Sequence, residues 1–230
     1  MTNAADKIIV ALDVPTKKAA LDLVTELGQQ ISFFKIGLQL FTAAGPDIVR
    51  KVLATGAKVF LDLKLYDIPN TVAHAVESAG ALGVHMLTIH LSGGEAMVKA
   101  AMAARSTELW ILGVTVLTSF DESAIRALGV ASTIEEQVSR LAKMGVAARV
   151  DGLVVSPLEI EVLRPQFGNN TRLVVPGIRP GWAAAGDQKR RMTPREALDA
   201  GADYLVIGRP IIAHSDPREA VAKIFAEIED

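Results

Sequence analysis

The sequence contains no cysteine and few aromatic residues. The lack of cysteine excludes disulfide bonds, thiolate metal sites and cysteine nucleophiles, and it is compatible with a reducing compartment. Only 5% of the residues are aromatic, whereas 50% are hydrophobic. With 230 residues, the chain can bury a sizeable core as one large domain or two small ones.

Strong charge of one sign and long apolar segments are also absent. Lys and Arg number 24 against 26 Asp and Glu, so the balance gives no reason to expect a nucleic-acid or anionic-membrane surface. No uninterrupted apolar stretch approaches membrane-spanning length, and the first residues run directly into a strand pattern. We therefore expect a soluble, cytoplasmic protein that binds neither nucleic acid nor membrane.

Short apolar runs alternate with helical patterns along the whole chain. The first run ends in Asp13, and the helical pattern that follows begins near Pro15 and Thr16 and stops at Gly28. Such nearly continuous apolar runs are typical of strands buried on both faces, as in a parallel sheet. The unit recurs, which predicts eight strands at residues 7–13, 33–40, 58–64, 85–91, 109–117, 152–156, 172–178 and 204–208. Capping patterns predict the starts of three later helices, at Ser132 or Thr133, at Thr193 and at Asp216.

The spacing of these units distinguishes between two α/β folds. Seven repeats separate Asp13, at the end of the first strand, from Arg209, at the end of the eighth, which is 28 residues for each repeat. No linker or change of composition interrupts them, and no G-x-G-x-x-G follows the first strand. The sequence therefore predicts a single (β/α)8 TIM barrel over residues 1–230 rather than an open doubly wound sheet.

Polar residues collect on or just after the predicted strands. In (β/α)8 barrels the carboxyl ends of the strands carry the active site. The residues found there are Asp13, Lys35, Asp62, Lys64, Asp67, His90, Thr118, Ser119, Arg179, Gly208 and Arg209. We therefore expect the chemistry of the protein at this rim.

The third strand and the residues after it hold the densest group of charges. Because side chains alternate along a strand, Asp62 and Lys64 are expected on one face, and Asp67 follows where the strand should end. A surface salt-bridge cluster is the ordinary explanation of such a pattern. Unpaired charge is costly on a buried strand, however, and Asp13 and Lys35 come from neighbouring strands. An Asp-Lys-Asp-Lys network with a functional role is therefore expected.

The last quarter of the chain predicts an anion site. Gly208 and Arg209 follow the eighth strand, where such barrels often bind phosphate, although a tight turn with a surface arginine would look the same. Residues 177–193 form an unusually long connection with three glycines. We expect this connection to be a mobile lid over the phosphate, with Arg179 and Gln188 as its contacts.

Other common catalytic arrangements find little support. His74, His85 and His214 have no neighbours at metal-ligand spacing and no H-E-x-x-H motif occurs, so no metal site is expected. Ser119 lacks the sequence context of a His-Asp relay. His90 ends the fourth strand and is either a base or a hydrogen-bonded structural imidazole, which the sequence leaves open.

Three stretches resemble the bacterial type of orotidine 5'-phosphate decarboxylase. They are residues 60–72 (FLDLKLYDIPNTV), 175–180 (VPGIRP) and 206–210 (VIGRP). The D-x-K-x-x-D core alone is shared by a wider superfamily, but the three stretches together are specific, and the resemblance spans essentially the whole chain. It implies conversion of orotidine monophosphate to uridine monophosphate and carbon dioxide, the last step of de novo pyrimidine synthesis, with no metal or organic cofactor.

The resemblance also implies roles for the charged residues. Lys64 would donate a proton to C6 of the pyrimidine, with Asp62 and Asp67 beside it and Lys35 completing the array. Asp67 and Thr71 would reach into the site of a neighbouring subunit, which implies a homodimer. A fixed ammonium suits this reaction, because loss of carbon dioxide leaves an in-plane carbanion that the ring cannot delocalise well.

Substrate contacts are implied in the same way. Asp13 and Lys35 would hold ribose hydroxyls, with Asp62 beside them, and either Thr118 or Ser119 would contact the pyrimidine. The resemblance assigns the phosphate to four further residues: Arg179, Gln188, Gly208 and Arg209.

Two other functions are compatible with the fold. One is a magnesium-dependent sugar-phosphate decarboxylase or synthase of the same superfamily, but such enzymes carry an acidic metal ligand on the second strand, where this chain has Lys35. The other is a non-catalytic barrel that binds nucleotides, which would not need the complete charged set.

Overall fold

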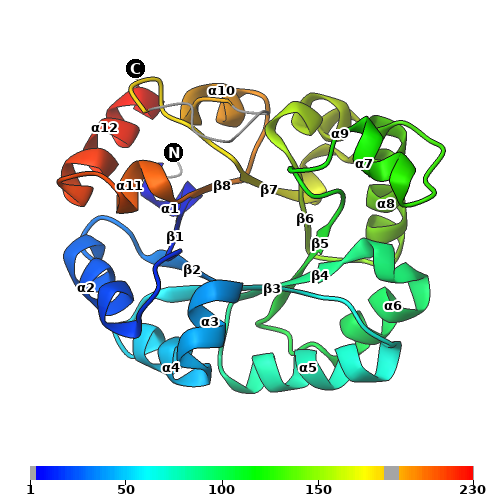
Figure 1. Cartoon of the computed structure of the whole chain (residues 1–230), viewed down its shortest axis with the longest axis horizontal. Helices are drawn as coiled ribbons and strands as arrows, with labels where there is room; N and C mark the ends of the chain where they lie inside the picture. The colour runs from blue at the N-terminus through cyan, green and yellow to red at the C-terminus, as the bar shows by residue number, and fades with distance from the viewer. Residues whose placement is uncertain (1–3, 184–191, 230) are drawn as a thin grey trace.

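The computed structural model describes residues 4–183 and 192–229, and it contains a closed barrel of eight parallel strands in chain order (Figure 1). Each strand pairs with its neighbours in sequence, and β8 pairs with β1. This confirms the predicted (β/α)8 fold. The strands are β1 (Ile8–Ala11), β2 (Phe33–Gly37), β3 (Lys58–Leu65), β4 (Met86–His90), β5 (Trp110–Val114), β6 (Gly152–Val154), β7 (Arg172–Pro176) and β8 (Tyr204–Ile207).

Helices surround the barrel on the outside (Figure 1). Four short α-helices among the described residues had not been predicted from the sequence, namely α1, α3, α7 and α11. The helices are α1 (Ala4–Lys7), α2 (Lys17–Leu27), α3 (Leu38–Ala44), α4 (Pro46–Leu53), α5 (Pro69–Ala81), α6 (Gly94–Ala104), α7 (Glu122–Ala127), α8 (Ile134–Ala147), α9 (Ile160–Phe167), α10 (Pro194–Asp199), α11 (Arg209–Ile212) and α12 (Pro217–Glu229).

The helix starts follow the local capping chemistry. Thr133 and Glu136 form a reciprocal capping box at the start of α8, so Thr133 and not Ser132 caps this helix. A second box, between Thr193 and Glu196, begins α10. Asp216 accepts the first free backbone N–H groups of α12. These three starts lie where the sequence placed them.

Several strands end earlier than their apolar runs. β1 stops at Ala11 and β5 at Val114, whereas the runs continue to Asp13 and Leu117. Leu12 and Val116 remain buried although they lie outside the ladder. An apolar pattern reports burial, so it cannot mark the residue at which strand pairing ends.

The core has two layers separated by the barrel wall. The larger layer packs between the strands and the helices. The smaller one fills the barrel interior and consists of Ile9, Ala11, Phe33, Phe60, Met86, Leu112, Val174 and Val206. Because side chains fill the barrel, ligands can reach only its two mouths, and the site lies above this layer.

None of the helices within residues 4–183 and 192–229 is both long enough and apolar enough to span a membrane.

Candidate active site

Four charged side chains form a continuous chain of ion pairs at the carboxyl-terminal mouth of the barrel. Lys35 Nζ on β2 lies 2.9 Å from Asp13 Oδ1, just after β1, and 3.5 Å from Asp62 Oδ2 on β3. Lys64 Nζ donates to both Asp62 oxygens, at 2.8 and 2.9 Å. The predicted Asp-Lys-Asp-Lys network is therefore present, and we call these four residues the charged array.

A bulge in β3 brings Lys64 to the array. The pairing of β3 with β4 passes from Leu61–Leu87 directly to Leu65–Ile89, so three residues of β3 stand opposite one of β4. Lys64 has a φ of +50°, which is rare for a residue with a side chain. Regular alternation was the basis for expecting Asp62 and Lys64 on one face. They do meet, but alternation is interrupted between them and the bulge creates the contact.

Thr88 on β4 is a member of this site that the sequence analysis missed. It is fully buried, its hydroxyl donates to Asp62 Oδ1 over 3.0 Å, and it accepts the backbone N–H of Lys64 over 2.9 Å. A hydroxyl within an otherwise apolar strand was the available signal, since buried polar groups need partners.

Gly37 at the end of β2 was also missed. A Cβ added there would lie 2.8 Å from Lys35 Nζ and 3.2 Å from Asp13 Oδ1. A side chain at this position would therefore displace the Lys35 ammonium from its present place. A glycine at a strand end is too common to reveal such a role from the sequence alone.

The electrostatic surroundings of Asp62 keep it ionised. Burial disfavours its charged form, but the positive charges of Lys35 and Lys64, together with hydrogen bonds from Lys64 and Thr88, outweigh burial. The pKa of the Asp62 carboxyl is therefore held below its ordinary value. The array keeps a carboxylate and two lysine side chains in fixed contact.

Two adjoining cavities open over the array. One, of about 270 Å³, extends from the array to Arg179, Gly208 and Arg209. The other, of about 150 Å³, extends toward Thr118 and is otherwise mainly apolar. Lys35, Asp62 and Lys64 line both, so the cavities form one site with a charged centre, a basic end and an apolar end.

The basic end contains three of the four residues predicted to bind phosphate. Arg179 is buried, and its backbone N–H donates to the Met192 carbonyl over 3.0 Å, which joins the two sides of the 177–193 connection. A Cβ added at Gly208 would lie 3.4 Å from Ala11 Cβ and 3.6 Å from Asp13 Oδ2, and Arg209 begins α11. Gln188 lies outside the described residues, as do all residues from 184 to 191 of the predicted lid.

The two candidates for the pyrimidine contact differ in position. Thr118 lines the apolar cavity beside the array, whereas Ser119 is exposed and does not line it. This geometry favours Thr118.

Asp67 and Thr71 do not join the array within one subunit. Both side chains are exposed, and Asp67 Oδ1 accepts the backbone N–H of the next residue over 2.6 Å. The neighbours of Asp67 are apolar and unusually exposed, at 64% for Tyr66 and 65% for Ile68.

His90 lies beside the array rather than in its ion-pair chain. Its ring contacts Tyr66, with centroids 5.9 Å apart, and it lines a separate, largely apolar cavity of about 760 Å³. Burial and the charge of Lys64 lower the pKa of His90, against a smaller opposite effect of Asp62. These surroundings favour the neutral imidazole.

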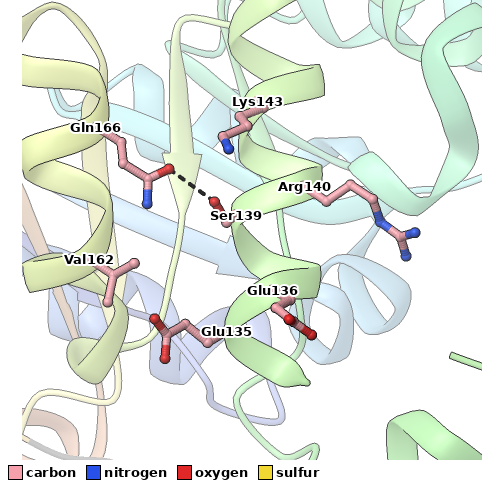
Figure 2. A pocket seen from close by; sticks show the side chains of 7 residues that line it. All are labelled: Glu135, Glu136, Ser139, Arg140, Lys143, Val162 and Gln166. Carbon is pink, nitrogen blue, oxygen red and sulfur yellow. Dashed lines mark hydrogen bonds between the residues drawn. The ribbon is translucent and has the colours of Figure 1, made fainter. Parts of the chain in front are cut away.

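A further groove lies on the outside of the barrel, between α8 and α9 (Figure 2). It measures about 450 Å³, and Ser139 donates to Gln166 across it over 2.9 Å. None of the residues predicted for the site lines this groove. Its Glu, Arg and Lys side chains are typical of solvated helix faces.

Comparison with known proteins places the chain in a family. The model of the orotidine 5'-phosphate decarboxylase / HUMPS family matches residues 6–224. The orotidine 5'-phosphate decarboxylase of Moorella thermoacetica is 50% identical over 99% of this chain and 94% of its own. That of Idiomarina loihiensis is 47% identical over 98% of this chain and 99% of its own.

Solved structures agree with the sequence comparisons. The orotidine 5'-phosphate decarboxylase of Lactobacillus acidophilus superposes with a TM-score of 0.85 and 35% identity, covering 97% of this chain and 99% of that one. The enzyme of the same name from Pyrococcus horikoshii gives 0.79 at 26% identity, with 97% and 99% covered. The chain belongs to the orotidine 5'-phosphate decarboxylase / HUMPS family.

Proposed function

We propose that this chain, as one catalytic domain over residues 1–230, decarboxylates orotidine 5'-monophosphate to uridine 5'-monophosphate and carbon dioxide in pyrimidine synthesis. The observation that carries the proposal is the charged array at the centre of a cavity with a basic end. An ammonium locked between carboxylate oxygens is suited to a carbanion that has no other means of stabilisation. The names of the relatives support the same reaction.

In the proposed mechanism the bond between C6 and the carboxylate breaks and its electron pair stays on C6. The Lys64 ammonium stabilises this pair and gives C6 a proton, and the neutral amine then takes a proton from water. Asp62 orients the Lys64 ammonium by accepting two hydrogen bonds from it. The positive charge of Lys35 offsets the negative charge of the Asp62 carboxylate. No cofactor enters these steps.

The remaining contacts follow the two ends of the cavity. Asp13 and Lys35 hold the ribose hydroxyls, and Thr118 contacts the pyrimidine at the apolar end. The phosphate binds at the basic end, with Arg179, Gly208, Arg209 and Gln188 as its partners. Because phosphate and C6 lie at different ends, phosphate binding contributes to positioning the reacting carbon.

A homodimer is part of the proposal. Asp67 and Thr71 would complete the site of the neighbouring subunit, and their exposure within one subunit supports this. The exposed Tyr66 and Ile68 on either side of Asp67 provide apolar surface for a subunit contact. Sedimentation of the wild type and of Asp67→Ala, with active-site titration of mixed dimers, tests it.

The magnesium-dependent sugar-phosphate enzymes remain the alternative. They need an acidic ligand where β2 carries Lys35, whose ammonium lies 3.5 Å from Asp62 and would repel the cation. Among residues 4–183 and 192–229, no group of three or more His, Asp or Glu side chains is placed to hold a metal ion. Activity measured with and without a chelator separates the two reactions.

The decisive experiment mixes the purified protein with orotidine monophosphate and a chelator and follows the ultraviolet absorbance. We expect rapid conversion to uridine monophosphate that the chelator does not change. Binding without any change of absorbance would instead support a non-catalytic nucleotide-binding barrel. A cytoplasmic location stays a prediction, which fractionation of cells tests.

A further inference from the structure

Thr88 holds two parts of the charged array with one hydroxyl group. It donates to Asp62 Oδ1 over 3.0 Å and accepts the backbone N–H of Lys64 over 2.9 Å. The residue is fully buried, so water does not compete for either bond. The hydroxyl therefore joins the backbone of Lys64 to the carboxylate that its ammonium contacts.

The Thr88 hydroxyl also replaces a hydrogen bond that regular pairing between β3 and β4 would have provided. Between the pairs Leu61–Leu87 and Leu65–Ile89, three residues of β3 face Thr88 alone. Lys64 there adopts a left-handed φ of +50°, a conformation that side chains disfavour. A backbone N–H in this interior position needs a partner, and the Thr88 hydroxyl is that partner. Tertiary contact thus maintains a backbone shape that the local sequence does not favour.

We propose that Thr88 is a positioning residue whose hydroxyl locks the β3 bulge and so holds the Lys64 ammonium against Asp62, ready to protonate the substrate. The inference rests on the proposed decarboxylase function. Thr88 does not line either site cavity, so it acts through Asp62 and Lys64 rather than on the substrate.

The charge state of Asp62 gives a second measurable consequence. The hydrogen bond from Thr88 favours the carboxylate, together with the bond from Lys64 and the charges of both lysines. Removing the hydroxyl therefore raises the pKa of Asp62. If the ionised form is the active one, the acid limb of kcat/KM moves to higher pH.

The test compares Thr88→Val, which keeps the shape and removes the hydroxyl, with Thr88→Ser, which keeps the hydroxyl. We expect valine to lower kcat about 10- to 100-fold, the range for one hydrogen bond to a charged group, with KM changed less than about threefold. The acid limb moves to higher pH in this variant. Serine should stay within about threefold of the wild type.

Thr115→Val is the matched control. Thr115 is also buried and donates its hydroxyl to the Val154 carbonyl over 3.2 Å, but it takes no part in the array. We expect this variant to lose some thermal stability while kcat and the acid limb stay unchanged. Equal losses of kcat in Thr115→Val and Thr88→Val would contradict the proposal, because they would show that Thr88 acts only through general packing.

The proposal is overturned if Thr88→Val turns over substrate as fast as the wild type with an unmoved acid limb. If Thr88→Val does not fold, Thr88→Cys replaces it, because cysteine has only a weak S–H donor. The kcat of Thr88→Cys should then lie between that of Thr88→Ser and the value expected for Thr88→Val. Wild-type activity in this cysteine variant would likewise overturn the proposal.

Measuring decarboxylation by the wild type first separates a failure of the proposed function from a failure of the Thr88 inference. If it does not decarboxylate orotidine monophosphate, the function is wrong. The pKa of Asp62, followed by carbon-13 NMR, then still tests positioning without any turnover. It should be higher in Thr88→Val than in the wild type, and an unchanged value would contradict the inference.

Discussion

The two mouths of the barrel are built from different chemistry. At the carboxyl-terminal mouth, Asp13, Lys35, Asp62 and Lys64 form a chain of ion pairs. At the amino-terminal mouth, a cavity of about 420 Å³ is lined mainly by residues that begin or precede strands. Its aromatic rings meet edge to face, with centroids 6.1 to 6.3 Å apart, and belong to Phe33, His85, Trp110 and Tyr204.

The difference separates reactivity from stability. Aromatic contacts and the Arg172 guanidinium, 3.8 Å from the centroid of the Trp110 ring, stabilise the amino-terminal mouth by packing. At the other mouth, the charges of Lys35 and Asp62 are buried, and paired buried charges add little stability, which is consistent with the proposed chemical role of the array. Changes at one mouth should therefore affect turnover, and changes at the other should affect unfolding.

Replacing Lys64 with alanine should have the largest effect. It removes the proposed proton donor and the main electrostatic stabilisation, so we expect kcat/KM for orotidine monophosphate to fall by about 10^4-fold or more. Steady-state absorbance assays measure this. Lys58→Ala is the matched control, because Lys58 lies on the same strand at the other mouth. Near-normal turnover of Lys64→Ala would rule out its proposed role.

Trp110→Ala should destabilise the protein at the amino-terminal mouth. Loss of the partly buried indole and of its stacking with Arg172 should lower the free energy of unfolding by about 2–3 kcal/mol. Denaturant unfolding gives this value. At a temperature where the variant is folded, kcat should equal that of the wild type, and a large loss of kcat would contradict the separation of the two mouths.

Gly37→Ala tests the close packing of the array. The new Cβ would lie 2.8 Å from Lys35 Nζ, so the lysine must move and its pair with Asp13 must loosen. We expect KM to rise about tenfold through poorer positioning of the ribose. Gly80→Ala serves as the control, because its Cβ would meet only ordinary contacts at 3.7 and 3.8 Å. Equal kinetics in the two variants would show that the array tolerates the shift.

His85→Gln should have the smallest effect, visible only in the pH dependence of stability. Burial and the charge of Lys58 lower the pKa of His85 below 6.5 in the folded state. Below pH 6.5 the unfolded chain therefore takes up a proton that the folded chain resists, and stability falls.

Glutamine removes this proton uptake and can still accept the Val59 N–H that His85 Nδ1 accepts. The variant should lose less stability between pH 7 and pH 5 than the wild type, as measured by denaturant unfolding at both values. His90, whose pKa is also lowered, keeps part of the dependence. The same loss of stability in His85→Gln and in the wild type would contradict this role of His85.

Local patterns in the sequence were enough to predict the barrel. Each of the eight apolar runs contains a strand, and the capping residues Thr133, Thr193 and Asp216 begin the helices expected of them. Both features depend on neighbours in the chain, which the sequence displays directly. Strand ends were less well predicted, because burial continues beyond the ladder at Leu12 and Val116.

The residue types of the candidate site could also be predicted from the sequence, because unpaired charge at the end of a buried strand is costly. Asp13, Lys35, Asp62 and Lys64 were expected to meet, and they do. Their arrangement was decided only by the tertiary structure. The bulge that brings Lys64 to Asp62, the hydroxyl of Thr88 and the space beside Gly37 all depend on contacts between strands that lie far apart in the chain. Such contacts have no local pattern, so the sequence determined which charged groups meet at this rim and the fold determined how they are held.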